Sequence, residues 1–206
     1  MNVDYSQLLL DIRNHLVATK CTSTPDITKA IEQFFEKQYQ NNYTVLPSSR
    51  DGGEFLVDIL VAAFNPRNLV NCDEKGSISL QETEPQVLLA VESELGGSGG
   101  SSPCGIMKNV VEDFMKLLLV TSHYKVLFFT SLPYVQEQNQ VENRVKILHS
   151  LFCKAQPVTN GLLLVHLNGT RPEAGAGQVK VTIENNNDVR GFYISETGGQ
   201  CFEIAI

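Results

Sequence analysis

The sequence predicts an α/β fold in which a central mixed β-sheet is flanked by helices. Short apolar, β-branched runs such as residues 87–91 and 161–167 are typical of buried strands. Other segments repeat apolar residues every three or four positions, as amphipathic helices do. Along the chain these segments alternate as two helices, three strands, helix, strand, helix and strand. That order favours a sheet covered by helices on both faces.

Two helices are expected at the start of the chain. In residues 1–22, Leu8, Ile12 and Leu16 recur at helical spacing. A second helix is expected from Thr24, because Pro25 suits a first helical turn and an apolar stripe follows it.

The rest of the chain is predicted to form the sheet and its remaining helices. Strands are expected near 43–46 and at 54–64, 86–94, 125–131 and 161–167, with a short one around Ile78, and helices at 106–121 and 140–154. Three further strands are expected at 178–184, 190–195 and 200–206, where they would extend the sheet or form a flap. We therefore expect a single domain over 1–206, with its core in 25–167 and a C-terminal β extension in 178–206.

Composition limits the classes of function. A formal net charge of −7 argues against a protein that coats nucleic acid by charge alone. The five cysteines are scattered without a C-x-x-C pair, which is typical of neither a disulfide framework nor a zinc site and favours the reducing cytoplasm. The start of the chain lacks a basic, apolar signal sequence, and no apolar run approaches the roughly 20 residues that span a bilayer. No membrane partner is expected.

Three acids stand in or beside strands that should be buried. Asp58 lies within the run 54–61, and Glu92 and Glu94 end the run 87–94. Alternation places Glu92 and Glu94 on one face, about 7 Å apart. A buried carboxylate is costly unless it is paired, hydrogen-bonded or bound to a metal. If the two strands are neighbours, the acids converge on one site, and oxygen ligands favour Mg²⁺ or Mn²⁺.

Each acid alone has a simpler interpretation. Glu92 and Glu94 can mark the end of a strand, because Gly96 and Gly97 follow, and Asp58 can pair with an arginine or cap a turn. The combination of three acids on two strands is what favours a metal site.

These residues resemble the PD-(D/E)xK nuclease superfamily, which has the restriction-endonuclease-like fold. The resemblance covers residues 25–167 and rests on Asp58, then Glu92-Ser93-Glu94 after an apolar run, then the helix with Asp113 and Lys116 and the strand 125–130. Glu94 replaces the usual lysine, as in an E-x-E subgroup that includes some type II restriction endonucleases. Val57 replaces the proline that often precedes the aspartate.

The resemblance implies a Mg²⁺-dependent endonuclease that cleaves DNA, and it implies roles for particular residues. Asp58 and Glu92 would bind the metal, with the Ser93 carbonyl as a third ligand, and Glu94 would orient or deprotonate water or hold a second metal. Glu36, on the helix before the Asp58 strand, would join the metal site, although a solvated glutamate is an equal alternative. Lys116 would supply the missing positive charge, or else pair with Glu112 or Asp113 on the helix surface.

Two other interpretations remain open at the level of sequence. The chain can be a catalytically inactive protein of the same fold, acting as a DNA-binding or assembly subunit; the net charge and the absent lysine favour this. It can also be an unrelated α/β domain with incidental acids. Because restriction-type enzymes often dimerise to cut both strands, the resemblance also implies a homodimer.

Overall fold

In the described residues, three of the four α-helices begin after a residue whose side chain satisfies free N–H groups of the first turn. The computed structural model describes residues 3–21, 23–47, 56–65, 68–72, 74, 76–81, 84–96, 102–170 and 179–206. Its helices are α1 (Tyr5–Thr19), α2 (Thr24–Tyr39), α3 (Pro103–Leu119) and α4 (Gln140–Ala155). The side chains of Asp4, Ser23 and Ser102 accept hydrogen bonds from the first turns of α1, α2 and α3. α3 therefore starts three residues earlier than its apolar periodicity predicts.

The strands form one mixed sheet and one separate ribbon. The sheet strands are β1 (Thr44–Pro47), β2 (Ile59–Ala62), β5 (Val87–Glu94), β6 (Tyr124–Ser131), β7 (Gly161–Thr170), β8 (Lys180–Val181), β9 (Val189–Ser195) and β10 (Cys201–Glu203). Within the described ranges they lie in the order β1-β2-β5-β6-β7-β9-β10, and β8 pairs with β7. β5, β6 and β7 are parallel, whereas the other pairs are antiparallel. The expected mixed sheet is confirmed.

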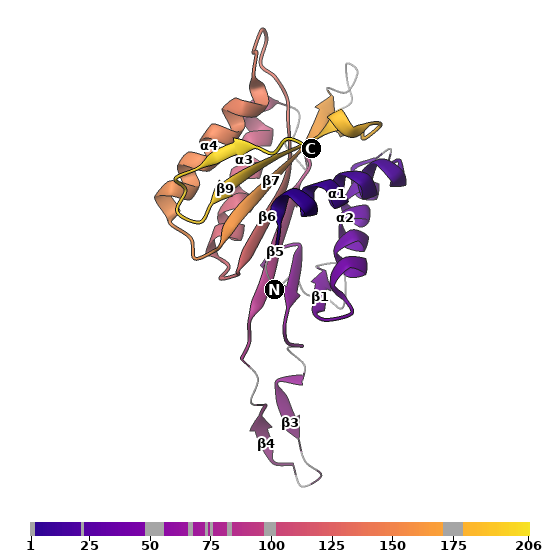
Figure 1. The fold of residues 1–206 in the computed structure, drawn as a ribbon, viewed down its shortest axis with the longest axis vertical. Helices are drawn as coiled ribbons and strands as arrows, with labels where there is room; N and C mark the ends of the chain where they lie inside the picture. The colour runs from indigo at the N-terminus through magenta and orange to yellow at the C-terminus, as the bar shows by residue number, and fades with distance from the viewer. Residues whose placement is uncertain are drawn as a thin grey trace.

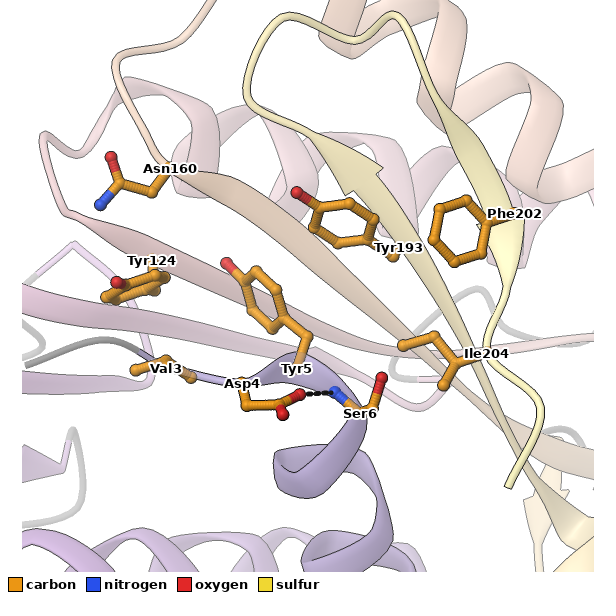
Figure 2. A pocket seen from close by; sticks show the side chains of 9 residues that line it. All are labelled: Val3, Asp4, Tyr5, Ser6, Tyr124, Asn160, Tyr193, Phe202 and Ile204. Carbon is orange, nitrogen blue, oxygen red and sulfur yellow. Dashed lines mark hydrogen bonds between the residues drawn. The ribbon is translucent and has the colours of Figure 1, made fainter.

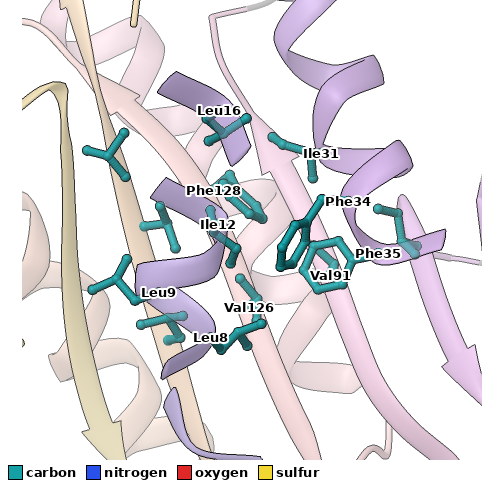
Figure 3. Packing of buried hydrophobic residues seen from close by; sticks show 14 of the residues in the cluster. Leu8, Leu9, Ile12, Leu16, Ile31, Phe34, Phe35, Val91, Val126 and Phe128 are labelled. Carbon is teal, nitrogen blue, oxygen red and sulfur yellow. The ribbon is translucent and has the colours of Figure 1, made fainter. Parts of the chain in front are cut away.

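Each face of the sheet carries its own helices and its own buried apolar cluster. α1 and α2 contribute residues such as Ile12 and Phe35, which pack with Val91 and Phe128 of the sheet (Figure 3). α3 and α4 pack on the other face, where Phe114 and Leu148 join Ala90, Leu127 and Leu164. Figure 1 shows the two helix pairs on opposite sides of the strands.

β2 is shorter than the sequence predicts. A strand was expected over 54–64, but it begins only at Ile59, after Leu56 in the left-handed region (φ 62°) and a bend at Asp58. Residues 54 and 55 lie outside the described part. The Asp58 carboxylate accepts a hydrogen bond from the Ser93 N–H on β5. This side-chain bond stands where a main-chain carbonyl would accept the N–H if the strand pairing continued. Asp58 is therefore a strand-entry residue and does not lie mid-strand.

The polar stretch between β2 and β5 contains two strands where only one was expected. β3 (Val70–Cys72) and β4 (Ile78–Leu80) form an antiparallel ribbon that projects from one end of the molecule (Figure 1). At the other end of the sequence, β9 and β10 continue the main sheet beyond β7. The C-terminal strands therefore extend the sheet and do not form a flap.

Candidate functional site

Glu92 is a buried carboxyl group on the sheet face that α3 covers. It lies two residues after Ala90, whose side chain packs in the cluster beneath α3 and α4. Its side chain is 2% exposed, and its Oε1 atom has no hydrogen-bond partner. Burial is the main reason that the pKa of Glu92 rises, with the negative charge of Asp58 second, to about 9. The raised pKa favours the protonated, neutral form of Glu92.

Asp58 meets Glu92 across neighbouring antiparallel strands. Ile59 pairs with Val91, so Asp58 stands directly beside Glu92. The Asp58 Oδ2 atom accepts the Ser93 N–H at 2.8 Å, and the Asp58 main-chain N–H in turn binds the Glu92 carboxyl group. These reciprocal bonds fix both carboxyl groups at the carboxyl end of the parallel strands, where open α/β sheets commonly bind ligands.

Ser93 turns its main chain toward Asp58. In a strand the N–H and C=O of one residue point to the same side, so the Ser93 carbonyl points to the same edge as the N–H that Asp58 binds. The Ser93 hydroxyl, which alternates to the α2 face, is buried without a hydrogen-bond partner.

α3 brings two more charges to this pair. The Lys116 ammonium lies 2.7 Å from Asp113 Oδ1, and the Lys116 side chain is 44% exposed. Both groups act on Glu92: Asp113 raises its pKa and Lys116 lowers it. The sequence offered two alternatives for Lys116: a pair on the helix surface, or a position near the acids. Lys116 does both, since it pairs with Asp113 and also acts on Glu92.

Glu94 stands at the end of β5, where the chain leaves the sheet. Its Oε1 atom accepts the N–H of Gly96 at 2.8 Å, so the carboxylate closes the turn after the strand. Gly96 itself adopts φ 98°, a conformation that side chains rarely take. By alternation Glu94 shares the face of Glu92, but the charges that act on Glu92 come from Asp58, Asp113 and Lys116.

Glu36 lies on an element that packs elsewhere. It is half-buried on α2, whose apolar residues join the cluster on the opposite face of the sheet from Ala90 and α3. The structure therefore brings together Asp58, Glu92 and Lys116, and it leaves Glu36 on the other face.

The oxygen atoms of Asp58, Glu92 and Ser93 are of the kind that binds a hard divalent cation. Two carboxylates and a nearby carbonyl are the oxygen ligands that Mg²⁺ and Mn²⁺ prefer, and the partnerless Oε1 of Glu92 is an acceptor that a cation would satisfy. No group of three or more His, Cys, Asp or Glu side chains in the described ranges is placed to hold a metal ion. A metal here would depend on two side chains, the main chain and water.

The sequence indicated Asp113 only through its helix and its pairing with Lys116, and it did not indicate Lys125 as a buried lysine that caps α3. Lys125 is fully buried on β6, and its ammonium donates to the Val120 carbonyl and to Ser122 Oγ. It thereby satisfies the carboxyl end of α3, and burial lowers its pKa to about 8. A lone lysine in a strand-like run was the only sequence signal for this role.

A separate cavity of about 400 Å³ lies near the start of β6 and β7 (Figure 2). It is lined by the rings of Tyr5, Tyr124, Tyr193 and Phe202, and at its rim the Asp4 carboxylate accepts the Ser6 N–H that begins α1. The cavity is on the α1 side of the sheet, and Asp58, Glu92 and Glu94 are not among its lining residues. It was not predicted from the sequence.

Comparison with models of known protein families gives no match for this chain, and no curated protein sequence is significantly similar to it. Across the described residues, no helix combines the length and the apolar character needed to cross a membrane.

Proposed function

We propose that this chain is a metal-dependent endonuclease that hydrolyses phosphodiester bonds in DNA, of the PD-(D/E)xK type with an E-x-E motif. The observation that carries the proposal is the Asp58–Glu92 pair, joined by reciprocal main-chain bonds on adjacent strands, with Lys116 acting on it from α3. The mixed sheet with helices on both faces is compatible with this superfamily.

In this proposal Asp58, Glu92 and the Ser93 carbonyl hold Mg²⁺ or Mn²⁺. The bound metal would polarise a phosphoryl oxygen and lower the pKa of a water molecule. Asp58 is already oriented by the Ser93 N–H. Because the pKa of Glu92 is raised, metal binding at neutral pH would release about one proton.

Two further side chains would serve the substrate. Lys116, partly exposed, would attract the scissile phosphate and replace the lysine that the motif lacks. Glu94 would orient or deprotonate the attacking water, for which its bond to the Gly96 N–H would have to rearrange or be shared.

A second candidate is a protein of the same fold without catalysis, acting as a DNA-binding or assembly subunit. It is favoured by the lack of a third ligating side chain in the described residues and by the net charge of −7. Glu92 would then simply remain a protonated, buried acid.

The test combines metal binding with cleavage. Thermal unfolding of the wild type is followed while MgCl₂ or MnCl₂ is added, and nicking of supercoiled plasmid is measured under the same conditions. We expect stabilisation of about 1.4 kcal/mol when the metal reaches ten times its Kd. Asp58→Asn and Glu92→Gln should each abolish this stabilisation and reduce nicking by about 100-fold or more.

The matched control is Glu112→Gln, which removes one exposed acid from α3 and should change neither quantity. No stabilisation by either metal, together with no nicking, would support the second candidate. Stabilisation that survives in both Asp58→Asn and Glu92→Gln would exclude this pair as the metal site.

A further inference from the structure

The aromatic cavity on the α1 side of the sheet is lined by four rings that contact one another (Figure 2). The centroids of neighbouring rings lie 5.8 Å apart for Tyr5 and Tyr124, 5.4 Å for Tyr5 and Tyr193, and 5.5 Å for Tyr193 and Phe202. The rings come from α1, β6, β9 and β10, so both ends of the described chain meet here. The volume of about 400 Å³ lies at the lower end of the range for small-molecule sites.

A hydrogen bond and a glycine hold these rings in place without any ligand. The Tyr5 hydroxyl donates to the Gly161 carbonyl at 2.7 Å and accepts a main-chain N–H of β6 at 3.3 Å. Gly161 has φ 133°, and a Cβ atom there would lie 2.9 Å from Cε2 of Tyr193, so glycine leaves the space that this ring occupies. Tyr5 and Tyr124 are buried, whereas Phe202 is 51% exposed. The cavity therefore has a fixed floor and an open rim.

The charges around the cavity favour a positive ligand. The Asp4 carboxylate lies at the exposed rim, and no lysine or arginine is among the described residues that line the cavity. The N–H groups of Ser6 and Gln7, which would otherwise attract an anion to the start of α1, are bonded to Asp4 Oδ1. The net charge of −7 also attracts cations to the molecule.

The inclination of the rings favours a compact cation over a flat molecule. Neighbouring ring planes in the cavity meet at 80°, 44° and 63°. A nucleobase stacks on an aromatic face and is best held between parallel faces, whereas inclined faces surround a rounded group. The π-face of each ring attracts positive charge. In the described part of the chain, arginines lie over the rings of Tyr134 and Phe192, and not over those of the cavity.

We propose that the aromatic cavity binds the quaternary ammonium group of a small organic cation of the choline type. The methyl groups of such a cation would lie against the rings of Tyr193 and Phe202, above the floor formed by Tyr5 and Tyr124, and the Asp4 carboxylate would balance its charge. A metal ion or a simple ammonium ion suits the cavity less, because ring faces do not replace the hydrogen bonds of a strongly hydrated ion. A quaternary ammonium group carries charge without N–H donors.

This site is independent of the proposed nuclease site. The cavity opens on the face of the sheet that α1 covers, whereas Glu92 lies on the face that α3 covers. Loss of either site should therefore leave the other intact.

Isothermal titration calorimetry of the intact chain tests the proposal with two matched ligands. Choline chloride is compared with the neutral carbon isostere of choline, in which a tert-butyl group replaces the trimethylammonium group, and sodium chloride serves as the blank. Choline should bind with a Kd of about 1 mM or below, and the isostere should bind about tenfold more weakly. Absence of choline binding up to about 10 mM, or equal binding of the isostere, would overturn the proposal.

Two variants place the binding in this cavity. Phe202→Leu keeps an apolar side chain at the rim but removes one ring, and it should weaken choline binding about two- to fivefold. Asp4→Asn removes the charge while keeping a side chain that caps helices well, and it should weaken binding by a similar factor, more strongly at low salt. The matched control Glu112→Gln removes one acid from α3 and should bind choline like the wild type.

Wild-type choline affinity in the double variant Asp4→Asn/Phe202→Leu would show that choline binds elsewhere, and would overturn the proposal. Because both residues are exposed, the variants should keep the wild-type thermal midpoint. The comparison of choline with its isostere uses the wild type alone, so it stands even if a variant folds poorly.

Two further probes separate the small cation from other ligands. A peptide that carries trimethyl-lysine contains the same ammonium group, and tighter binding of this peptide than of choline would assign the cavity to a methylated protein instead. Tighter binding of thymidine would show that the rings stack on a base. Either result would overturn the proposal, and choline as the tightest of the three would support it.

Discussion

Glu92 and His166 are both buried beside charged neighbours, and they respond to pH in opposite ways. Burial and then Asp58 raise the pKa of Glu92. Burial and then Arg190 lower the pKa of His166 to about 3, and its ring bonds the Ser131 hydroxyl. Each group stays neutral in the folded protein. At any pH where the same group is ionised in the unfolded chain, it therefore lowers the free energy of unfolding.

Glu92→Gln should stabilise the metal-free protein at neutral pH. Between 4.5 and about 9 the folded state holds a proton on Glu92 that the unfolded state has lost, so stability falls as pH rises through that window. The amide removes this penalty, and we expect a gain of about 1–3 kcal/mol at pH 7. Urea unfolding from pH 5 to 9 measures it, with Glu112→Gln as the control.

A loss of stability in Glu92→Gln at pH 7 would show that the carboxylate is ionised and structurally paired. The metal site proposed above would then lose its main support.

His166→Gln should make the protein less sensitive to acid. Between about 3 and 6.5 the unfolded chain binds a proton at this histidine and the folded chain does not, so stability falls as pH drops below 6.5. One proton corresponds to about 1.4 kcal/mol per pH unit. Unfolding free energies between pH 6.5 and 4 should show a slope reduced by that amount, relative to the wild type.

The comparison variant is His123→Gln, which removes a histidine that is exposed on the surface. A slope in His166→Gln equal to that of the wild type would mean that the buried ring is already charged in the folded state.

Part of the site was predictable at this scale, and part was not. Apolar runs interrupted by acids correctly predicted that Glu92 lies in a buried strand, but they placed Asp58 inside a strand that begins only at Ile59. The Ser93 N–H that holds Asp58, and the Asp113 charge from α3, depend on how strands and helix meet in space. A one-dimensional pattern specifies which face a residue occupies, but not which charge lies opposite it.

At the scale of elements, α1 packs closely on β9 because Gly191 of β9 has no side chain. A Cβ atom built on Gly191 would lie 2.1 Å from Leu9 Cδ2 and 2.9 Å from Leu9 Cγ, and Leu9 is fully buried. The helix therefore approaches the strand more closely than any other residue at 191 would allow.

Gly191→Ala should destabilise the protein by about 1–3 kcal/mol, because the extra methyl group overpacks a closed interface. Equilibrium urea unfolding measures the loss. Adding Leu9→Ala should recover part of the packing strain, so the double variant should lose less than the sum of the single changes. Gly199→Ala, whose nearest neighbour would be 3.3 Å away, should have little effect.

A full additive loss in the double variant would show that the two residues do not share this contact.

The boundaries of elements were less predictable than their existence. The apolar stripes correctly indicated all four helices, since their periodicity is long and regular. The ribbon was half missed, because Val70 and Cys72 stand among polar residues and form a strand only through pairing with Leu80 and Ile78. Residues 56–58 of the expected strand 54–64 lie outside β2, and there the Asp58 carboxylate accepts the Ser93 N–H.

Across the whole molecule, three features occupy different places on one sheet. The acidic pair lies at the carboxyl end of β5 on the α3 face, the aromatic cavity lies at the start of β6 and β7 on the α1 face, and the ribbon leaves the sheet before β5. The sequence predicted the layers because alternation specifies faces. It did not predict the strand order, which depends on contacts between distant segments.

The contacts of α1 have a consequence for how the chain folds. Tyr5 donates to the Gly161 carbonyl, 156 residues away, and Arg13 donates to the Ile206 carbonyl, 193 residues away. Loops of this length must close before these contacts form, because the closure entropy is lost before the contacts repay it. The docking of α1 on the sheet should therefore be a late and slow step of folding.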